Sequence, residues 1–106
     1  MIAVNRGEVW WYEDPETGRR PVCVITRQAA VPILHRVIVV PATRTISGIP
    51  SEVELKRADG MPDHCALSAD NIRVVPKARL TRRITRLKPA KLAELCTALA
   101  IATGCE

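Results

Sequence analysis

Apolar residues occur along most of the chain in short runs that have the length and composition of β-strands. Val, Ile and Thr dominate the two longest runs, residues 21–27 and 34–40, and β-branched residues favour strands. The unbroken apolar character of residues 21–27 predicts a strand that is buried on both faces. Residues 7–13 predict a strand ahead of it, and the turn-forming residues 14–18 separate the two.

Shorter runs follow in the middle of the chain. Residues 51–55 alternate polar and apolar positions, as a half-buried strand does. Residues 65–75 predict one or two strands, broken near Ser68, Ala69 and Asp70. Short strands at this spacing are typical of a small barrel or sandwich. The polar or turn-rich segments between the strands are predicted loops: residues 28–32, 41–49 and 56–64.

The last part of the chain has the pattern of a helix. Pro89 is suited to be the first helical residue, and Gly104 is suited to end the helix. Four side chains between them have helical spacing and predict one buried face: Leu92, Leu95, Cys96 and Leu99. We therefore expect a mainly β protein with a C-terminal helix, in a single domain that spans residues 1–106.

The charge of the chain indicates a polyanionic partner. The formal net charge is +5, and no acidic residue occurs between Asp70 and Glu94. Such a block attracts nucleic acid or an acidic partner segment, although a solvated surface would have the same composition. Phe is absent and only three residues are aromatic, which argues against a platform that stacks several bases. The block contains eight basic residues: Arg73, Lys77, Arg79, Arg82, Arg83, Arg86, Lys88 and Lys91.

Other features narrow the class of protein. No apolar run approaches the roughly 20 residues that span a bilayer, and the N-terminus lacks the pattern of a secretory signal, so we expect a cytoplasmic protein. The cysteines have no short paired spacing, which disfavours a zinc site and favours buried or unreactive thiols. They are Cys23, Cys65, Cys96 and Cys105.

The residues that nucleophilic or metal chemistry needs are sparse. His35 falls within a predicted strand and His64 within a turn-rich loop, positions that favour structural or surface roles. His64 and Cys65 next to Asp63 form only a weak metal-binding pattern. We therefore predict no metal site and no cofactor.

Arg20 and Thr43 are the stronger candidates for chemistry. Arg20 precedes the second strand and Thr43 follows the third, so both would lie on one rim if the strands are neighbours. Arginine suits phosphate because its guanidinium is planar, charged and rich in donors, and a threonine hydroxyl can donate to a phosphoryl oxygen. Such a pair could stabilise the charge that develops when a ribose 2′-hydroxyl attacks its own phosphate. Thr45 and Ser47 add hydroxyl groups nearby.

Six motifs in this order resemble the MazF/PemK toxin family over nearly the whole chain. They are Arg-Gly-Glu-Val-Trp at 6–10, Arg-Pro-Val-Cys-Val-Ile at 20–25, Val-Ile-Val-Val-Pro-Ala-Thr at 37–43, Pro-Ser-Glu-Val at 50–53, Ala-Asp-Asn-Ile at 69–72 and Arg-Leu-Thr-Arg-Arg-Ile at 79–84. The resemblance implies a small SH3-like barrel with helices, assembled as a homodimer. It also implies the toxin of a toxin–antitoxin pair.

The same resemblance implies an activity and its residues. Members are endoribonucleases that cleave single-stranded RNA without a metal and leave 2′,3′-cyclic phosphate and 5′-hydroxyl ends. By position, the family's catalytic arginine and threonine correspond to Arg20 and Thr43. An antitoxin segment, acidic and C-terminal, is the implied protein partner. We expect further RNA contacts from Arg19, Thr45, Ser47, Asn71 and Arg79.

Two other functions are compatible with the sequence. A toxin of the same fold could bind a protein target such as gyrase, as CcdB does, and would not need Arg20 together with Thr43. A barrel that only binds nucleic acid could use the basic block, with an affinity that falls steeply with salt.

Overall fold

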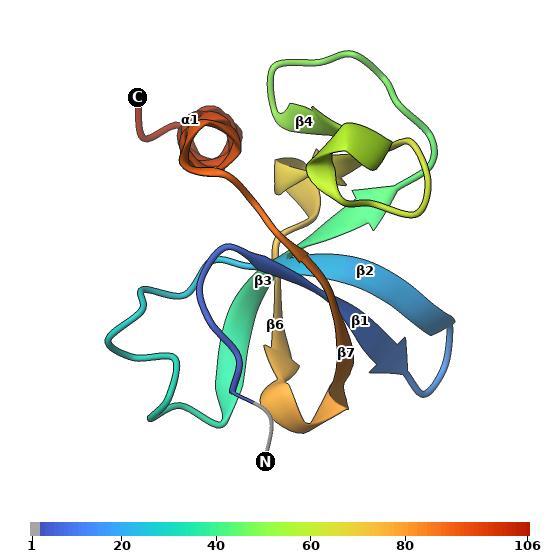
Figure 1. Ribbon diagram of the computed structural model, residues 1–106. Coiled ribbons are helices and arrows are strands. Elements are labelled where there is room, and N and C mark those ends of the chain that lie inside the picture. The colour runs from blue at the N-terminus through green and yellow to red at the C-terminus, as the bar shows by residue number, and fades with distance from the viewer. Residues whose placement is uncertain (1–2) are drawn as a thin grey trace.

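The computed structural model describes residues 3–106, which form seven strands and one α-helix (Figure 1). Three short 3-10 turns, Arg57–Asp59, Ala69–Asn71 and Lys77–Arg79, connect strands in the second half. Within the described residues, no helix has both the length and the apolar character to cross a membrane. The main elements are β1 (Glu8–Asp14), β2 (Gly18–Val24), β3 (Arg36–Thr43), β4 (Glu52–Leu55), β5 (Cys65–Ser68), β6 (Arg73–Pro76), β7 (Leu80–Arg86) and α1 (Pro89–Thr103).

The strands pair antiparallel in the order β4-β5-β3-β2-β1-β7, and β6 also pairs with β3. Strand β3 is central because β2 occupies one of its edges, while β6 and β5 share the other. This arrangement confirms the predicted mainly β fold with a C-terminal helix. The sheet is not closed, because no pairing within residues 3–106 joins β4 to β7, so the barrel is open.

Strand β2 separates two hydrophobic cores. Val22 and Val24 point into one core, which the β1, β3, β6 and β7 strands surround. Cys23 points into the other, which α1 and the β4–β5 hairpin cover. All three side chains have no exposed surface, which confirms the prediction that this strand is buried on both faces. Figure 1 shows the helix and β4 together on one side of the curved sheet.

Helix α1 begins with Pro89 and ends at Gly104, as the sequence predicted. Its buried face consists of Leu95 and Ala98, with Leu92 and Leu99 partly buried beside them. Cys96 was predicted on that face but is exposed. The apolar stripe of the helix runs from Leu92 through Leu95 to Ala98 and Leu99, at spacings of three and four residues. Cys96 lies beside this stripe and therefore faces solvent.

Several strand limits differ from those predicted, and β2 ends at Val24 rather than at residue 27. Strand β2 begins at Gly18, so Arg20 lies within it, and β3 continues to Thr43. Strand β3 also begins at Arg36, which leaves His35 exposed ahead of it. Strand β7 was not predicted, because its many arginines hide the alternation of a strand. It forms because β1 offers a free edge, with which it pairs through two irregularities.

A buried carboxylate links β1 to β7. Glu8 is 1% exposed and accepts hydrogen bonds from the Asn5 amide at 2.7 Å, the Trp10 indole at 3.1 Å and the Arg83 guanidinium at 3.1 Å. Burial opposes ionisation of Glu8, but the hydrogen bonds from Trp10, Asn5 and Arg83 outweigh it and lower the pKa of this carboxyl. Glu8 is therefore ionised in the folded protein, and its charge is paired with that of Arg83.

We predict that Glu8→Gln lowers the free energy of unfolding at pH 7 by about 1–3 kcal/mol, because it weakens charge-assisted hydrogen bonds in a buried site. The folded pKa of Glu8 is lowered, so its stabilisation is complete above the unfolded value near 4.3 and is lost as pH falls through the folded pKa. Urea unfolding at fixed protein concentration should therefore show a difference between wild type and variant that shrinks below about pH 4. Glu16→Gln in the exposed β1–β2 turn is the control, and an equal effect from it would contradict the assignment.

Candidate active site

Arg20 and Thr43 lie near the end at which β2 pairs with β3. The paired register of β2 and β3 runs from Val24 with Val39 to Val22 with Pro41. Arg20 lies two residues before Val22, and Thr43 lies two residues after Pro41. Both side chains line the same two hollows in the surface. The structure thus places Arg20 and Thr43 beside the same two hollows.

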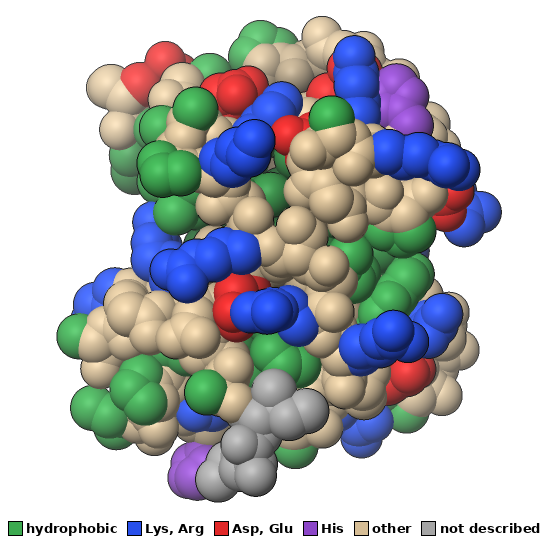
Figure 2. Space-filling model, viewed as in Figure 1, with side chains coloured by type: hydrophobic (Ala, Val, Ile, Leu, Met, Phe, Trp, Pro, Cys, Tyr) green, Lys and Arg blue, Asp and Glu red, His purple; other side chains and the backbone are tan. Residues whose placement is uncertain are grey.

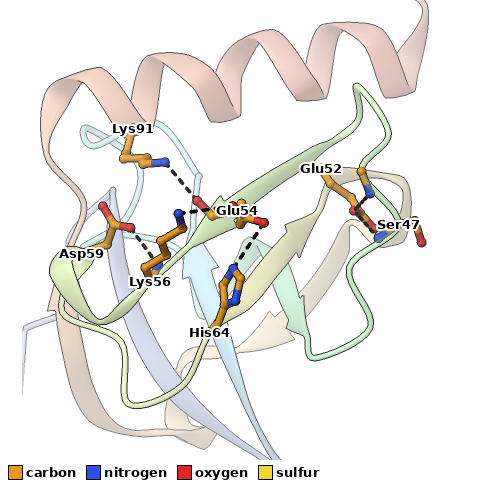
Figure 3. Close-up of polar contacts among 8 residues, drawn as sticks. Ser47, Glu52, Glu54, Lys56, Asp59, His64 and Lys91 are labelled. Carbon is orange, nitrogen blue, oxygen red and sulfur yellow. Dashed lines mark hydrogen bonds and ion pairs between the residues drawn. The ribbon is translucent and has the colours of Figure 1, made fainter.

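The first hollow, which we call the hydroxyl hollow, has a volume of about 350 Å³. The Thr43 hydroxyl oxygen accepts a hydrogen bond from the Thr45 amide at 3.2 Å, which orients the side chain and leaves its own proton available to donate. Glu52 accepts hydrogen bonds from the amides of Ser47 and Gly48 at 2.9 and 3.1 Å and holds the loop after β3 (Figure 3). The residues that line the hydroxyl hollow are Arg20, Pro41, Ala42, Thr43, Thr45, Ser47, Glu52, Ser68 and Asn71.

The second hollow, which we call the tryptophan hollow, has a volume of about 380 Å³. The Arg19 guanidinium lies over the Trp11 ring at 4.2 Å from its centroid. Arg44 forms an ion pair with Asp63 at 3.3 Å, in which both side chains are largely exposed. The lining has three arginines and one carboxylate, so it favours an anionic ligand: Trp11, Arg19, Arg20, Pro21, Ala42, Thr43, Arg44, Met61, Pro62, Asp63 and Cys65.

The arginine at the centre of the site is available to a ligand. Arg20 is exposed, and within residues 3–106 its guanidinium has no ion pair or hydrogen bond. Thr43 is partly buried at the end of β3. Together they offer a fixed positive charge and a hydroxyl donor, where the two hollows meet, to one phosphate group.

Several basic residues of the block 73–91 have partners within the fold. Figure 2 shows Lys and Arg side chains spread over the visible face of the molecule rather than gathered in one patch. Several belong to the fold: Arg73 pairs with Asp14 at 3.4 Å, Arg83 with the buried Glu8, and Lys91 donates to the backbone of β4 at 3.0 Å. Most of the charge available at the site comes instead from the first half of the chain.

The structure places four of the five predicted RNA contacts in the hollows. Arg19 lines the tryptophan hollow, and Thr45, Ser47 and Asn71 line the hydroxyl hollow. Arg79 lies in the turn between β6 and β7 and lines neither hollow. The sequence did not indicate Trp11, whose place in the site depends on its orientation in β1.

Neither histidine is placed to act on a phosphate in these hollows. His35 is exposed ahead of β3, and His64 pairs with Glu54 at 3.2 Å on the outer side of the β4–β5 hairpin (Figure 3). Both observations agree with the surface roles that the sequence predicted. Within residues 3–106, no group of three or more His, Cys, Asp or Glu side chains is arranged to hold a metal ion.

The cysteines divide into two buried and two exposed thiols. Burial raises the pKa of Cys23 to about 12. Burial, with Asp63 and Asp59 nearby, also raises the pKa of Cys65, which lines the tryptophan hollow. A thiolate is the reactive form of cysteine, so these two positions offer no nucleophile at neutral pH. The site thus presents positive charge and hydroxyl donors, and the thiol that lines it is not in its reactive form.

Comparison with known proteins identifies the family. The sequence model of one protein family, the PemK-like, MazF-like toxins of type II toxin–antitoxin systems, matches residues 5–103. The chain therefore belongs to this family. It is 46% identical to "Probable endoribonuclease MazF5" of Mycobacterium tuberculosis strain H37Rv over 94% of this chain and 93% of that protein. It is 43% identical to "Probable endoribonuclease MazF2" of the same strain over 96% of this chain and 100% of that protein.

Solved structures of toxins have the same fold. A mycobacterial endoribonuclease in complex with its cognate antitoxin superposes with a TM-score of 0.89 and 29% identity over 98% of both chains. The Mycobacterium tuberculosis toxin MazF-mt6 superposes with a TM-score of 0.84 and 28% identity, over 92% of this chain and 96% of that one. These matches confirm the resemblance on which the sequence analysis relied.

We predict that the thiols react in two classes with Ellman's reagent at pH 8. Cys96 and Cys105 are exposed and should react first, while Cys23 and Cys65 should react only after unfolding in urea. Cys96→Ser should remove one thiol from the fast phase and none from the slow phase. A rapid reaction of Cys65 in the folded protein, shown by its loss in Cys65→Ser, would contradict the absence of a reactive thiol in the tryptophan hollow.

Proposed function

We propose that this chain is an endoribonuclease toxin that cleaves single-stranded RNA at a phosphate held between Arg20 and Thr43. The observation that carries the proposal is that Arg20 of β2 and Thr43 of β3 line both hollows. Two curated relatives at 43–46% identity carry the name endoribonuclease, which supports the same activity here.

The RNA supplies the nucleophile in this mechanism. The ribose 2′-oxygen attacks the adjacent phosphorus and loses its proton to solvent, and the bond from phosphorus to the 5′-oxygen breaks. The departing 5′-oxygen takes a proton from water. The products are a 2′,3′-cyclic phosphate and a 5′-hydroxyl. No protein nucleophile is required, in keeping with the raised pKa values of Cys23 and Cys65.

Arg20 and Thr43 act on the charge that develops during attack. The non-bridging oxygens become more negative as the fifth bond to phosphorus forms, and a preorganised guanidinium and hydroxyl stabilise that charge. Arg20 stays protonated in proteins and so serves as a donor rather than a base. The Thr45 amide holds the Thr43 oxygen, which directs its proton away from the backbone and toward the ligand.

The hydroxyl hollow is the proposed source of sequence selectivity. Asn71 and Ser47 can both donate and accept hydrogen bonds, as the reading of base edges in single-stranded RNA requires. Asn71 donates to Ser68 at 2.7 Å, which fixes the direction of its amide. Thr45 and Arg19 are also proposed RNA contacts. Arg79 lines neither hollow, so its proposed contact is with a more distant part of the bound RNA.

The remaining proposals concern partners and setting. An acidic C-terminal segment of an antitoxin would suit the three arginines of the tryptophan hollow, and one structural neighbour was solved with its cognate antitoxin. We further propose a cytoplasmic homodimer in which residues 1–106 form one toxin domain and no metal takes part in cleavage. A CcdB-like toxin that binds gyrase is less favoured, because the curated relatives named above are endoribonucleases.

We predict that Arg20→Ala and Thr43→Val each lower kcat/KM for RNA cleavage by about a hundredfold or more, since each removes a donor to the transition state. Thr43→Ser keeps the hydroxyl and should retain most activity. Arg27→Ala is the matched control, because this exposed arginine follows the opposite end of β2. Initial rates on a fluorescent single-stranded RNA measure the effect, and thermal melts check that the variants are folded. Cleavage by Arg20→Ala at the wild-type rate would contradict the proposed role.

We predict that purified protein cleaves single-stranded RNA equally well with and without EDTA. Ligation of an adaptor to 5′-hydroxyl ends in treated total RNA, followed by sequencing, should reveal new ends that share a short motif. The same protein with Arg20→Ala should yield none. Toxicity in cells without any new 5′-hydroxyl ends would favour the gyrase-binding alternative, and complete loss of cleavage in EDTA would exclude the metal-free mechanism.

A further inference from the structure

Trp11 is the one aromatic side chain in the chain that is placed to contact a ligand. The other two, Trp10 and Tyr12, are 1% and 5% exposed and belong to the core beneath β1. Side chains alternate along a strand, so Trp11 projects from the opposite face, where it is partly exposed and lines the tryptophan hollow. The fold thus leaves one indole ring accessible beside the candidate catalytic pair.

Arg19 places a guanidinium over this ring. Its guanidinium lies 4.2 Å from the ring centroid, and Arg19 sits on the neighbouring strand, where it pairs with Glu13 in the backbone register. Both residues are anchored in the β1–β2 hairpin, so the stack is held by regular strand pairing. Bases of single-stranded RNA stack on aromatic rings and on guanidinium planes alike.

The position of this stack relates it to the reacting phosphate. The tryptophan hollow shares Arg20, Ala42 and Thr43 with the hydroxyl hollow, so a strand of RNA that occupies both passes over the Arg20–Thr43 pair. Met61 and Pro62 add apolar surface, which suits the face of a base. Arg44 adds positive charge, which suits a neighbouring phosphate.

We propose that the tryptophan hollow is a nucleobase subsite, in which the base adjacent to the scissile phosphate packs against the Arg19–Trp11 stack. This inference rests on the proposed RNA cleavage and assigns to Trp11 a role in holding the substrate. Stacking tolerates any base because every base has a planar face. The subsite therefore contributes affinity and position, while hydrogen bonds in the hydroxyl hollow select the sequence.

Binding of an RNA that cannot be cleaved tests the subsite apart from catalysis. The probe is a 12-nucleotide single strand of mixed sequence with 2′-O-methyl groups throughout, followed by fluorescence anisotropy. Trp11→Ala should weaken binding about 5- to 100-fold, the range for loss of one stacked base, and Trp11→Phe should restore much of it. Arg27→Ala is the control, and thermal melts confirm that each variant is folded. Equal affinities for wild type, Trp11→Ala and Trp11→Phe would overturn the inference.

Cleavage kinetics separate this inference from the proposed function. Trp11→Ala should raise KM by a similar factor with little change in kcat, whereas Arg20→Ala should lower kcat. If the wild type binds the methylated RNA through Trp11 but cleaves no RNA, the proposed function fails and the subsite stands. If the wild type cleaves and Trp11→Ala has unchanged KM and kcat, the subsite fails and the nuclease stands.

Substrates that lack a single base identify which base of the RNA occupies the tryptophan hollow. Once cut sites are mapped, RNAs that lack one base on either side of the cut are compared with the intact RNA for wild type and Trp11→Ala. Removal of the base that occupies the hollow should weaken binding to the wild type and have little further effect on Trp11→Ala. Additive losses at every position would show that no base contacts Trp11 and would overturn the proposal.

Discussion

The pairing of β2 with β3 in a single register is the interaction on which the rest of the structure depends. A slip of one residue would turn every side chain of β2 to the opposite face and separate Arg20 from Thr43. The register is secured by burial on both faces, because Val22 and Val24 belong to one core and Cys23 to the other. A polar site at the strand ends is thereby positioned by apolar packing in the middle of the same strands.

The long central strand extends this control to the whole site. One edge of β3 pairs with β2, and the other is divided between β6 and β5, so its last residues bring Ser68 and the turn at Asn71 alongside Thr43. The opposite wall comes from the hairpin of β1 and β2, which carries Trp11 and Arg19. Local pairing thus assembles residues from both halves of the chain without any long-range polar contact between the two catalytic candidates.

Much of this arrangement was accessible from the sequence, and the exceptions have physical causes. The apolar β-branched runs predicted the strands, and Pro89 and Gly104 predicted the limits of the helix. The positions of Arg20 and Thr43 at the ends of two such runs predicted that both lie on one rim of the sheet. Strand β7 was missed because its pairing depends on the free edge of β1 rather than on its own apolar pattern. Trp11 was missed because three successive aromatic residues hide which one faces outward. The pairing of Arg73 with Asp14 and of Arg83 with Glu8 was not predicted, because each pair joins residues that are distant in the sequence.

Two connecting segments form part of the walls of the two hollows, and strand residues form the rest. Residues 44–48 and 61–63 line or support the site, yet except for Met61 they are not part of either core. Substitutions in these segments can therefore accumulate without disturbing the strands that hold Arg20 and Thr43. The surroundings of Arg20 and Thr43 can therefore change in evolution while the strands that hold these two residues stay the same.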